Sequence, residues 1–200
     1  MKKTLTKLIR FFQRKVGKKI KSDTDLSDIS LITPATSDGE LAIEYYYKSD
    51  YLNAFQAAER AAKQEDAAGF MYLALMYLFG RGVSQNYSLA SENFLKAAEL
   101  GRRDAMYNLA SMYRYGRGID INYQEALKFY ERAAQKGHVD SIYELGYMYF
   151  DGCEVAQNYI KAKEYFIKAA DLGSEEALYK LALMYLGLYQ ITVYKQPLSH

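Results

Sequence analysis

The sequence predicts an all-α protein in which helix–turn–helix repeats of 36 residues follow one another and stack into a solenoid. One motif carries this prediction, because it occurs three times at a constant distance of 36 residues. Its copies are MYLFGRGVSQNY at Met76–Tyr87, MYRYGRGIDINY at Met112–Tyr123 and MYFDGCEVAQNY at Met148–Tyr159. A fourth copy begins in register at Met184-Tyr185 and then breaks off. Self-similarity at a fixed period of about 20 to 50 residues is typical of stacked repeat architectures.

The bulk composition excludes several classes of protein. Half of the 200 residues are apolar, so a sizeable core is available. The single cysteine, Cys153, rules out an internal disulfide framework and favours a reducing compartment. No run of 18 apolar residues is present, so no membrane-spanning helix is expected. Arg10 interrupts the apolar stretch Leu8–Phe12, which argues against an ordinary secretory signal, and we expect a cytoplasmic protein.

The first 21 residues form a basic segment. They contain nine Lys or Arg and no Asp or Glu, so the rest of the chain carries −7 within a net charge of +2. An apolar stripe at helical spacing runs through Leu5, Leu8, Phe12, Val16 and Ile20. Two interpretations remain open. The segment is either a solvated basic tail, or an amphipathic helix that docks on a partner or lies peripherally on the anionic inner surface of a membrane.

A linker and a short helix pair come next. Residues 22–39 are rich in Ser, Thr and Asp and contain Pro34, which is linker composition. The first helix pair is expected at Leu41–Lys48 and Tyr51–Lys63. Its turn lacks the Gly-x-Gly of the later copies.

Three fuller units start at Ala68, Asp104 and Asp140, and each is expected to consist of a helix A, a ten-residue turn and a helix B. Small and large apolar residues recur at helical spacing and predict the packing face of helix A. They are Leu73, Leu109 and Leu145, then Ala74, Ala110 and Gly146, then Met76, Met112 and Met148. The last unit begins at Glu176, and its helix A pattern ends at Leu186 without the signals of a helix B.

Glycine and asparagine mark the expected helix ends. Glycine tolerates the positive φ at which many helices stop, and an asparagine side chain accepts a hydrogen bond from a free N–H of the first turn. The predicted stops of helix A are Gly80, Gly116 and Gly152, and those of helix B are Gly101, Gly137 and Gly173. The predicted caps of helix B are Asn86, Asn122 and Asn158.

These residues resemble the Sel-one-like repeat family, a branch of the tetratricopeptide superfamily. The resemblance rests on Ala105, Leu109, Ala110, Tyr113, Gly116, Gly118 and Ile119 in the first half of a unit, and on Ala126, Tyr130, Ala133, Ala134 and Gly137 in the second. Asparagine replaces the usual aspartate cap, and Glu154 stands where the other units have the second glycine. The resemblance implies a right-handed α/α superhelix whose helices A line a concave surface. It also implies adaptors that hold proteins or peptides, often in bacterial signalling, secretion and toxin or immunity contexts.

The chain therefore divides into a basic segment, a linker, a solenoid and a tail. The expected boundaries are 1–21, 22–39, 40–186 and 187–200, with repeat units at about 40–67, 68–103, 104–139, 140–175 and 176–186.

Residues that could carry chemistry are scarce. His138 lies in a Gly-His turn and is expected to be a loop residue rather than a metal ligand. Cys153 has no base placed beside it in the sequence, so a nucleophile is not expected. No strand precedes the Gly-Arg-Gly turns, so they are not phosphate loops. We therefore expect no enzyme, no metal, no cofactor, no small-molecule substrate and no nucleic-acid partner.

Partner recognition is expected at helix A positions that vary between units and lie off the packing face. Spacings of three, four and seven place each set on one face of its helix. The set is Tyr72, Leu75, Phe79, Asn108, Ser111, Tyr115, Glu144, Tyr147 and Asp151, continued by Lys180 and Leu183. The first hypothesis is a non-catalytic scaffold that holds a protein or peptide there, a bacterial toxin-neutralising protein being one version. The alternative is a membrane-surface adaptor anchored by the basic segment.

Overall fold

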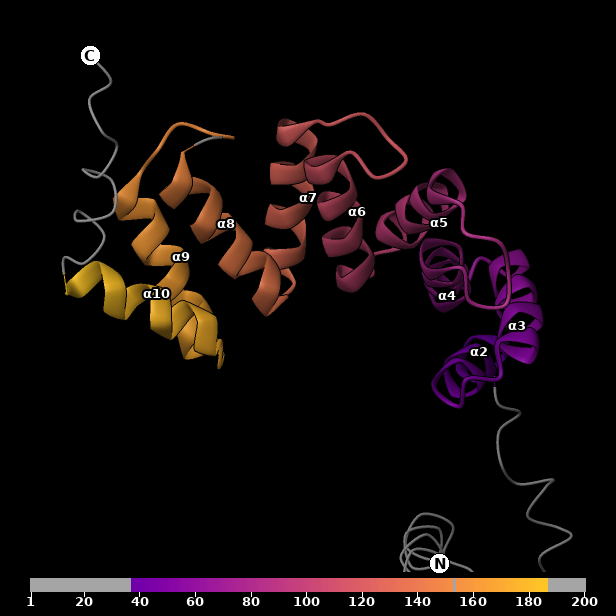
Figure 1. Cartoon of the computed structure of the whole chain (residues 1–200). Coiled ribbons are helices and arrows are strands. Elements are labelled where there is room, and N and C mark those ends of the chain that lie inside the picture. The colour runs from indigo at the N-terminus through magenta and orange to yellow at the C-terminus, as the bar shows by residue number, and fades with distance from the viewer. Residues whose placement is uncertain (1–36, 153, 187–200) are drawn as a thin grey trace, which may run out of the picture. The chain divides into compact units, whose positions relative to one another are not determined.

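The structure is a computed structural model and describes residues 37–152 and 154–186. The chain divides into two units, 1–36 and 37–200, and all described residues belong to the second. The basic segment, most of the linker, Cys153 and the tail after Leu186 lie outside the described residues. Throughout the described part, every regular element is an α-helix, which confirms the all-α repeat solenoid (Figure 1).

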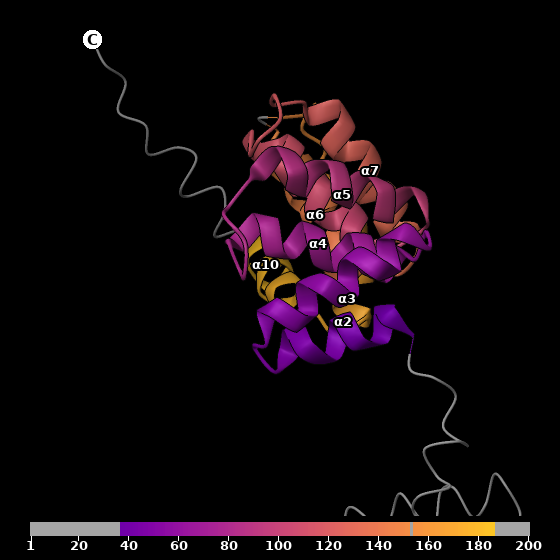
Figure 2. The ribbon, with the colours of Figure 1, turned by 90° about the vertical axis from the view of Figure 1, so that its right-hand side faces the viewer.

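The helices occur in pairs with constant lengths. The first pair is α2 (Asp38–Tyr47) and α3 (Tyr51–Lys63). The fuller units are α4 (Ala67–Phe79) with α5 (Tyr87–Glu99), α6 (Arg103–Tyr115) with α7 (Tyr123–Gln135), and α8 (Val139–Asp151) with α9 (Tyr159–Asp171). Helix α10 (Glu175–Tyr185) is a further helix A. Each helix packs against the helices before and after it in sequence, and α2 also packs against α4. Figure 2 shows α2, α3, α4 and α5 in this succession.

The first helix and the turns differ from their expected bounds. Helix α2 begins at Asp38, because the Ser37 side chain accepts from the backbone N–H of Glu40 while the Glu40 carboxylate accepts from the N–H of Ser37. This reciprocal pair satisfies two N–H groups that a helix start leaves free. The turns between helices A and B comprise residues 80–86, 116–122 and 152–158, seven residues rather than ten, because the helices extend further than the apolar pattern indicates.

The predicted caps are confirmed. Asn86, Asn122 and Asn158 each accept a hydrogen bond of 3.0 Å from the backbone N–H three residues later. Gly80, Gly116 and Gly152 end the helices A with φ of +65°, +65° and +72°. The glycines after the helices B also have positive φ, but each follows its helix by one residue, as Gly101 follows the C-cap Leu100.

A glutamate occupies one of these left-handed positions. Glu65 has φ +57° and lies 36 residues before Gly101, in the register of the helix B stops. A residue with a Cβ pays about 1–2 kcal/mol in this conformation. We expect Glu65→Gly to stabilise the protein by about 1 kcal/mol, measured by urea denaturation. Glu65→Ala is the matched control, since it keeps the Cβ, and an equal gain in both variants would contradict this explanation.

The core lies between helices A and B and is built from the repeated positions. Ala74 and Ala110 are fully buried, as are Met76 and Met148. At Gly146 a Cβ would lie 2.8 Å from the Phe166 ring, so helix B approaches helix A as closely as the residues allow. Small residues at this contact therefore set the spacing of the layers.

The second glycine of the turn allows one unit to approach the preceding unit closely. A Cβ added at Gly118 would lie 2.3 Å from the Cβ of Tyr87, at the start of α5. Gly82 approaches Tyr51 in the same way, at 2.8 Å. In the third unit Glu154 occupies this place in the turn, and its side chain accepts a hydrogen bond from Arg114.

Candidate protein-binding surface

The expected partner-binding residues lie on α4, α6 and α8, but they differ in exposure. Phe79 and Tyr115 are 55% and 53% exposed, and Asp151 is also exposed. The half-buried members are Leu75, Asn108, Ser111, Glu144 and Tyr147. On α10, Lys180 and Leu183 are half-buried too. We call these ten residues the helix-A surface.

Tyr72 is placed differently, because only 6% of it is exposed. Its ring packs edge-on against Tyr46, with centroids 5.1 Å apart, and against Tyr47 at 6.4 Å. Burial, followed by its hydrogen bond to Tyr47, raises the pKa of the Tyr72 hydroxyl. Tyr72 therefore packs α4 against α2 and offers little surface to a partner.

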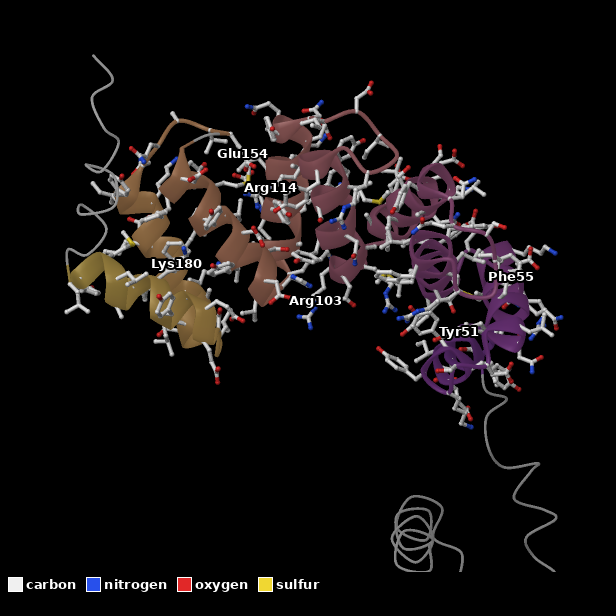
Figure 3. All side chains as sticks on the ribbon, viewed as in Figure 1. Tyr51, Phe55, Arg103, Arg114, Glu154 and Lys180 are labelled. Atoms are coloured by element: carbon white, nitrogen blue, oxygen red, sulfur yellow. The ribbon has the colours of Figure 1, made fainter. Side chains whose placement is uncertain are left out.

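A buried arginine lies in the middle of the helix-A surface, and sequence reasoning missed it. The Arg114 side chain is 5% exposed and holds the register position of Leu78 and Phe150, which are core residues. Its Nη1 donates to Oε2 of Glu144 at 2.5 Å, and its Nε donates to Oε1 of Glu154 at 2.7 Å. Figure 3 shows Arg114 and Glu154 close together. The sequence signal was a charge at a Leu/Phe position, combined with Glu154 at a glycine position.

The three charges depend on one another. Burial disfavours the charged guanidinium, but the hydrogen bond to Glu154 and the charges of Glu154 and Glu144 outweigh it and raise the pKa of Arg114. Burial also raises the pKa of Glu144, and Arg114 opposes this shift. The second carboxylate oxygen of Glu154, Oε2, is buried and has no hydrogen-bond partner among the described residues. The three charges are therefore paired, but one carboxylate oxygen lacks a hydrogen bond. Removing any one of the charges would leave another buried without its partner, which destabilises the fold.

Arginine and lysine side chains contact the aromatic rings of this surface. The guanidinium carbon of Arg114 lies 5.2 Å from the ring centroid of Tyr115 and 5.5 Å from that of Tyr147. Arg117 approaches Tyr115 to 5.7 Å, and the Nζ of Lys180 approaches Tyr147 to 5.1 Å. Each such contact within about 6 Å contributes roughly 0.5–2 kcal/mol. The rings of Tyr115 and Tyr147 are thus held in place before any partner binds.

The same arrangement recurs at the first fuller unit. The guanidinium of Arg81 lies 5.1 Å from the Phe79 ring and 5.3 Å from the Tyr46 ring. Its Nη1 also donates to the Tyr46 hydroxyl at 2.7 Å. An exposed ring beside an ordered arginine is therefore present on α4 as well as on α6.

His138 has a structural role at the start of α8. Its Nδ1 accepts from the backbone N–H of Ser141 at 3.2 Å and so caps α8. Its ring stacks on Tyr107 with centroids 4.7 Å apart. Burial lowers the pKa of His138 below its ordinary value of 6.5, more than the nearby Asp140 and Asp104 raise it, and Arg103 adds to the lowering.

A pH dependence of stability follows from this cap. Because the folded-state pKa of His138 is lowered, the unfolded chain takes up the proton first as the pH falls below 6.5. The stability due to neutral His138 is therefore complete above that value and is lost as the pH falls towards the folded-state pKa. We expect Tm to fall less for His138→Asn, which caps without titrating here, when both proteins are melted between about pH 8 and about pH 5. Parallel curves would contradict the assignment.

Within residues 37–152 and 154–186, no group of three or more His, Cys, Asp or Glu side chains comes together to hold a metal ion. No helix in that same part is long and apolar enough to cross a membrane.

The paired helices, the repeated caps and the solenoid packing define an α-helical repeat protein of the tetratricopeptide-like class. The Sel1 repeat model matches residues 32–49, 71–101, 103–138, 139–174 and 175–192, and the chain belongs to the Sel1 repeat family. Members of this family are generally scaffolds for protein interaction and are typically non-catalytic.

Two solved structures are similar over most of the chain. A Sel1 repeat protein from Oxalobacter formigenes matches with 31% identity and a TM-score of 0.70 over 74% of this chain and 59% of its own. A protective antigen of uropathogenic Escherichia coli with an SLR fold matches with 30% identity and a TM-score of 0.72, over 83% of this chain and 36% of its own. The chain thus spans less than two-thirds of either protein. A search of curated protein sequences finds no match.

Proposed function

We propose that this protein is a non-catalytic scaffold that binds a protein or peptide partner along the helix-A surface. The observation that carries the proposal is the pair Tyr115 and Tyr147, which lie on successive helices A with cations against their rings. The repeated positions of these helices are buried in packing, whereas these variable ones retain surface. Aromatic side chains bury a large area at a small entropy cost, and interfaces concentrate their binding energy on such residues.

Affinity capture of the full chain from its native cells, followed by mass spectrometry, tests this proposal. A specific partner should be retained by the parent and by a control carrying Leu52→Ala and Ile160→Ala. These control residues are apolar, 67% and 75% exposed, and lie on the helices B α3 and α9. Capture that depends on the control positions instead would place binding on the helices B. A toxin-neutralising role is a narrower version of this function, and it requires that the captured partner is a toxin whose activity falls on binding.

A membrane-surface adaptor is the second candidate, favoured by the nine positive charges and the apolar stripe within residues 1–21. Flotation with anionic vesicles should separate the two. Binding that is present in the full chain and absent from a chain starting at Ser37, which keeps the cap of α2, would favour the adaptor. Equal flotation of both chains would exclude the basic segment as the anchor.

A further inference from the structure

The outward face of α10 is apolar and largely exposed within the described residues, although the Nζ of Lys163 on α9 lies 4.5 Å from the ring centroid of Tyr185. Leu178 is 56% exposed, whereas its counterparts in the preceding units, Ile142 and Met106, are 0% and 1% exposed. Tyr185 is 68% exposed. Ala182 is also exposed, although the equivalent position on α8 is the fully packed Gly146.

In the earlier units this face of helix A is closed by helix B. On α8, the space above Gly146 is filled by the Phe166 ring of α9. Helix α10 repeats the face with which α8 packs against its helix B. The segment after α10, however, lacks the signals that start a helix B. In that segment Leu188 replaces the glycine stop and Tyr194 replaces the asparagine cap. A repeat without its helix B needs a polar outer face or a cover, because a contiguous apolar patch promotes association.

The segment 187–200 has the chemistry of such a cover. It reads GLYQITVYKQPLSH and carries Lys195 as its one Lys, Arg, Asp or Glu. Ile191 keeps the 36-residue register of Val83, Ile119 and Val155, which are half-buried turn residues packed against the core. The Sel1 repeat match likewise continues past α10 to residue 192. Within the segment 187–200, the stretch 189–194, YQITVY, has no charge and no proline. This is the composition of segments that aggregate when left exposed.

We propose that residues 187–200 fold back over α10 and cover Leu178, Ala182 and Tyr185 in the place where the other units have helix B. Each of the two apolar surfaces would be a liability in water, and they are adjacent in the chain. A directly linked segment acts at an effective concentration of about millimolar, which exceeds that of a second copy at ordinary protein concentrations. Intramolecular docking is therefore favoured over association through the same face.

Hydrogen exchange of the full-length protein tests the docking. Backbone amides of residues 189–196 should exchange at least about tenfold more slowly than unstructured reference rates, a factor equal to about 1.4 kcal/mol of opening free energy. Leu178→Ser with Tyr185→Ser should remove this protection. The matched control, Leu52→Ser with Ile160→Ser, changes two apolar residues on α3 and α9 that are somewhat more exposed than the α10 pair, and it should leave the protection unchanged.

Two results would overturn the proposal. One is exchange at reference rates throughout 189–196 in the parent, and the other is protection that survives the α10 variant while α10 itself stays helical. Light scattering identifies the competing occupant: a mass that doubles with concentration, and returns to monomer in the α10 variant, would assign the face to a second copy. Ile191→Ser, which changes no described residue, should remove the protection of residues 189–196 in the same way as the α10 variant does.

Discussion

Replacing Arg114 with leucine is expected to lower the free energy of unfolding by about 3–5 kcal/mol, although leucine holds the same position in the first fuller unit. The reason is the pair of carboxylates that the change leaves behind. The side chains of Glu144 and Glu154 are 22% and 15% exposed, and Arg114 donates hydrogen bonds to both. Removing one partner from a buried ion cluster leaves uncompensated charge, which costs more than the cluster itself contributes.

The repeats supply the control for this prediction. Asn108 and Gly118 of the preceding unit hold the register positions of Glu144 and Glu154. The triple change Arg114→Leu, Glu144→Asn and Glu154→Gly should therefore return the stability to within about 1 kcal/mol of the parent. Urea denaturation followed by circular dichroism measures both variants. A triple variant no more stable than Arg114→Leu would show that the arginine acts through packing alone.

The sequence predicts those parts of the fold that depend on residues close together in the chain. The asparagine caps and the glycine stops were predictable because each acts within one helical turn. The arginine cluster was not, because it joins two repeat units: Arg114 lies in one unit, and Glu144 and Glu154 lie on a helix and a turn of the next. The burial of Tyr72 also depends on a distant element, since Tyr46 and Tyr47 of α2 cover it. For Arg114 the clue was a departure from the repeat pattern rather than the pattern itself.

The second large effect is expected on binding. Tyr115→Ala with Tyr147→Ala should weaken partner binding by at least about 30-fold, because truncating a central interface aromatic commonly costs about 2 kcal/mol or more. The helical signal should be retained. A stability loss of about 1 kcal/mol is expected, since Tyr147 gives up its contacts with Arg114 and Lys180. Isothermal titration of the purified partner measures the affinity, and Leu52→Ala with Ile160→Ala is the control on the helices B.

Each outcome of that titration has a definite meaning. Loss of the helical signal in the tyrosine variant would assign both rings to the core. Unchanged affinity with an intact fold would move the binding surface away from α6 and α8. Loss of affinity in the control as well would indicate a general effect of removing apolar surface.

Hydrogen exchange of the protein with and without its captured partner tests the scaffold most directly. Binding along the helix-A surface predicts that amides on α6 and α8, around Tyr115 and Tyr147, gain protection together. The helices B α5, α7 and α9 should change little on their outer faces. Protection confined to the helices B, to residues 1–36 or to residues 187–200 would contradict the account and assign recognition to that part of the chain instead.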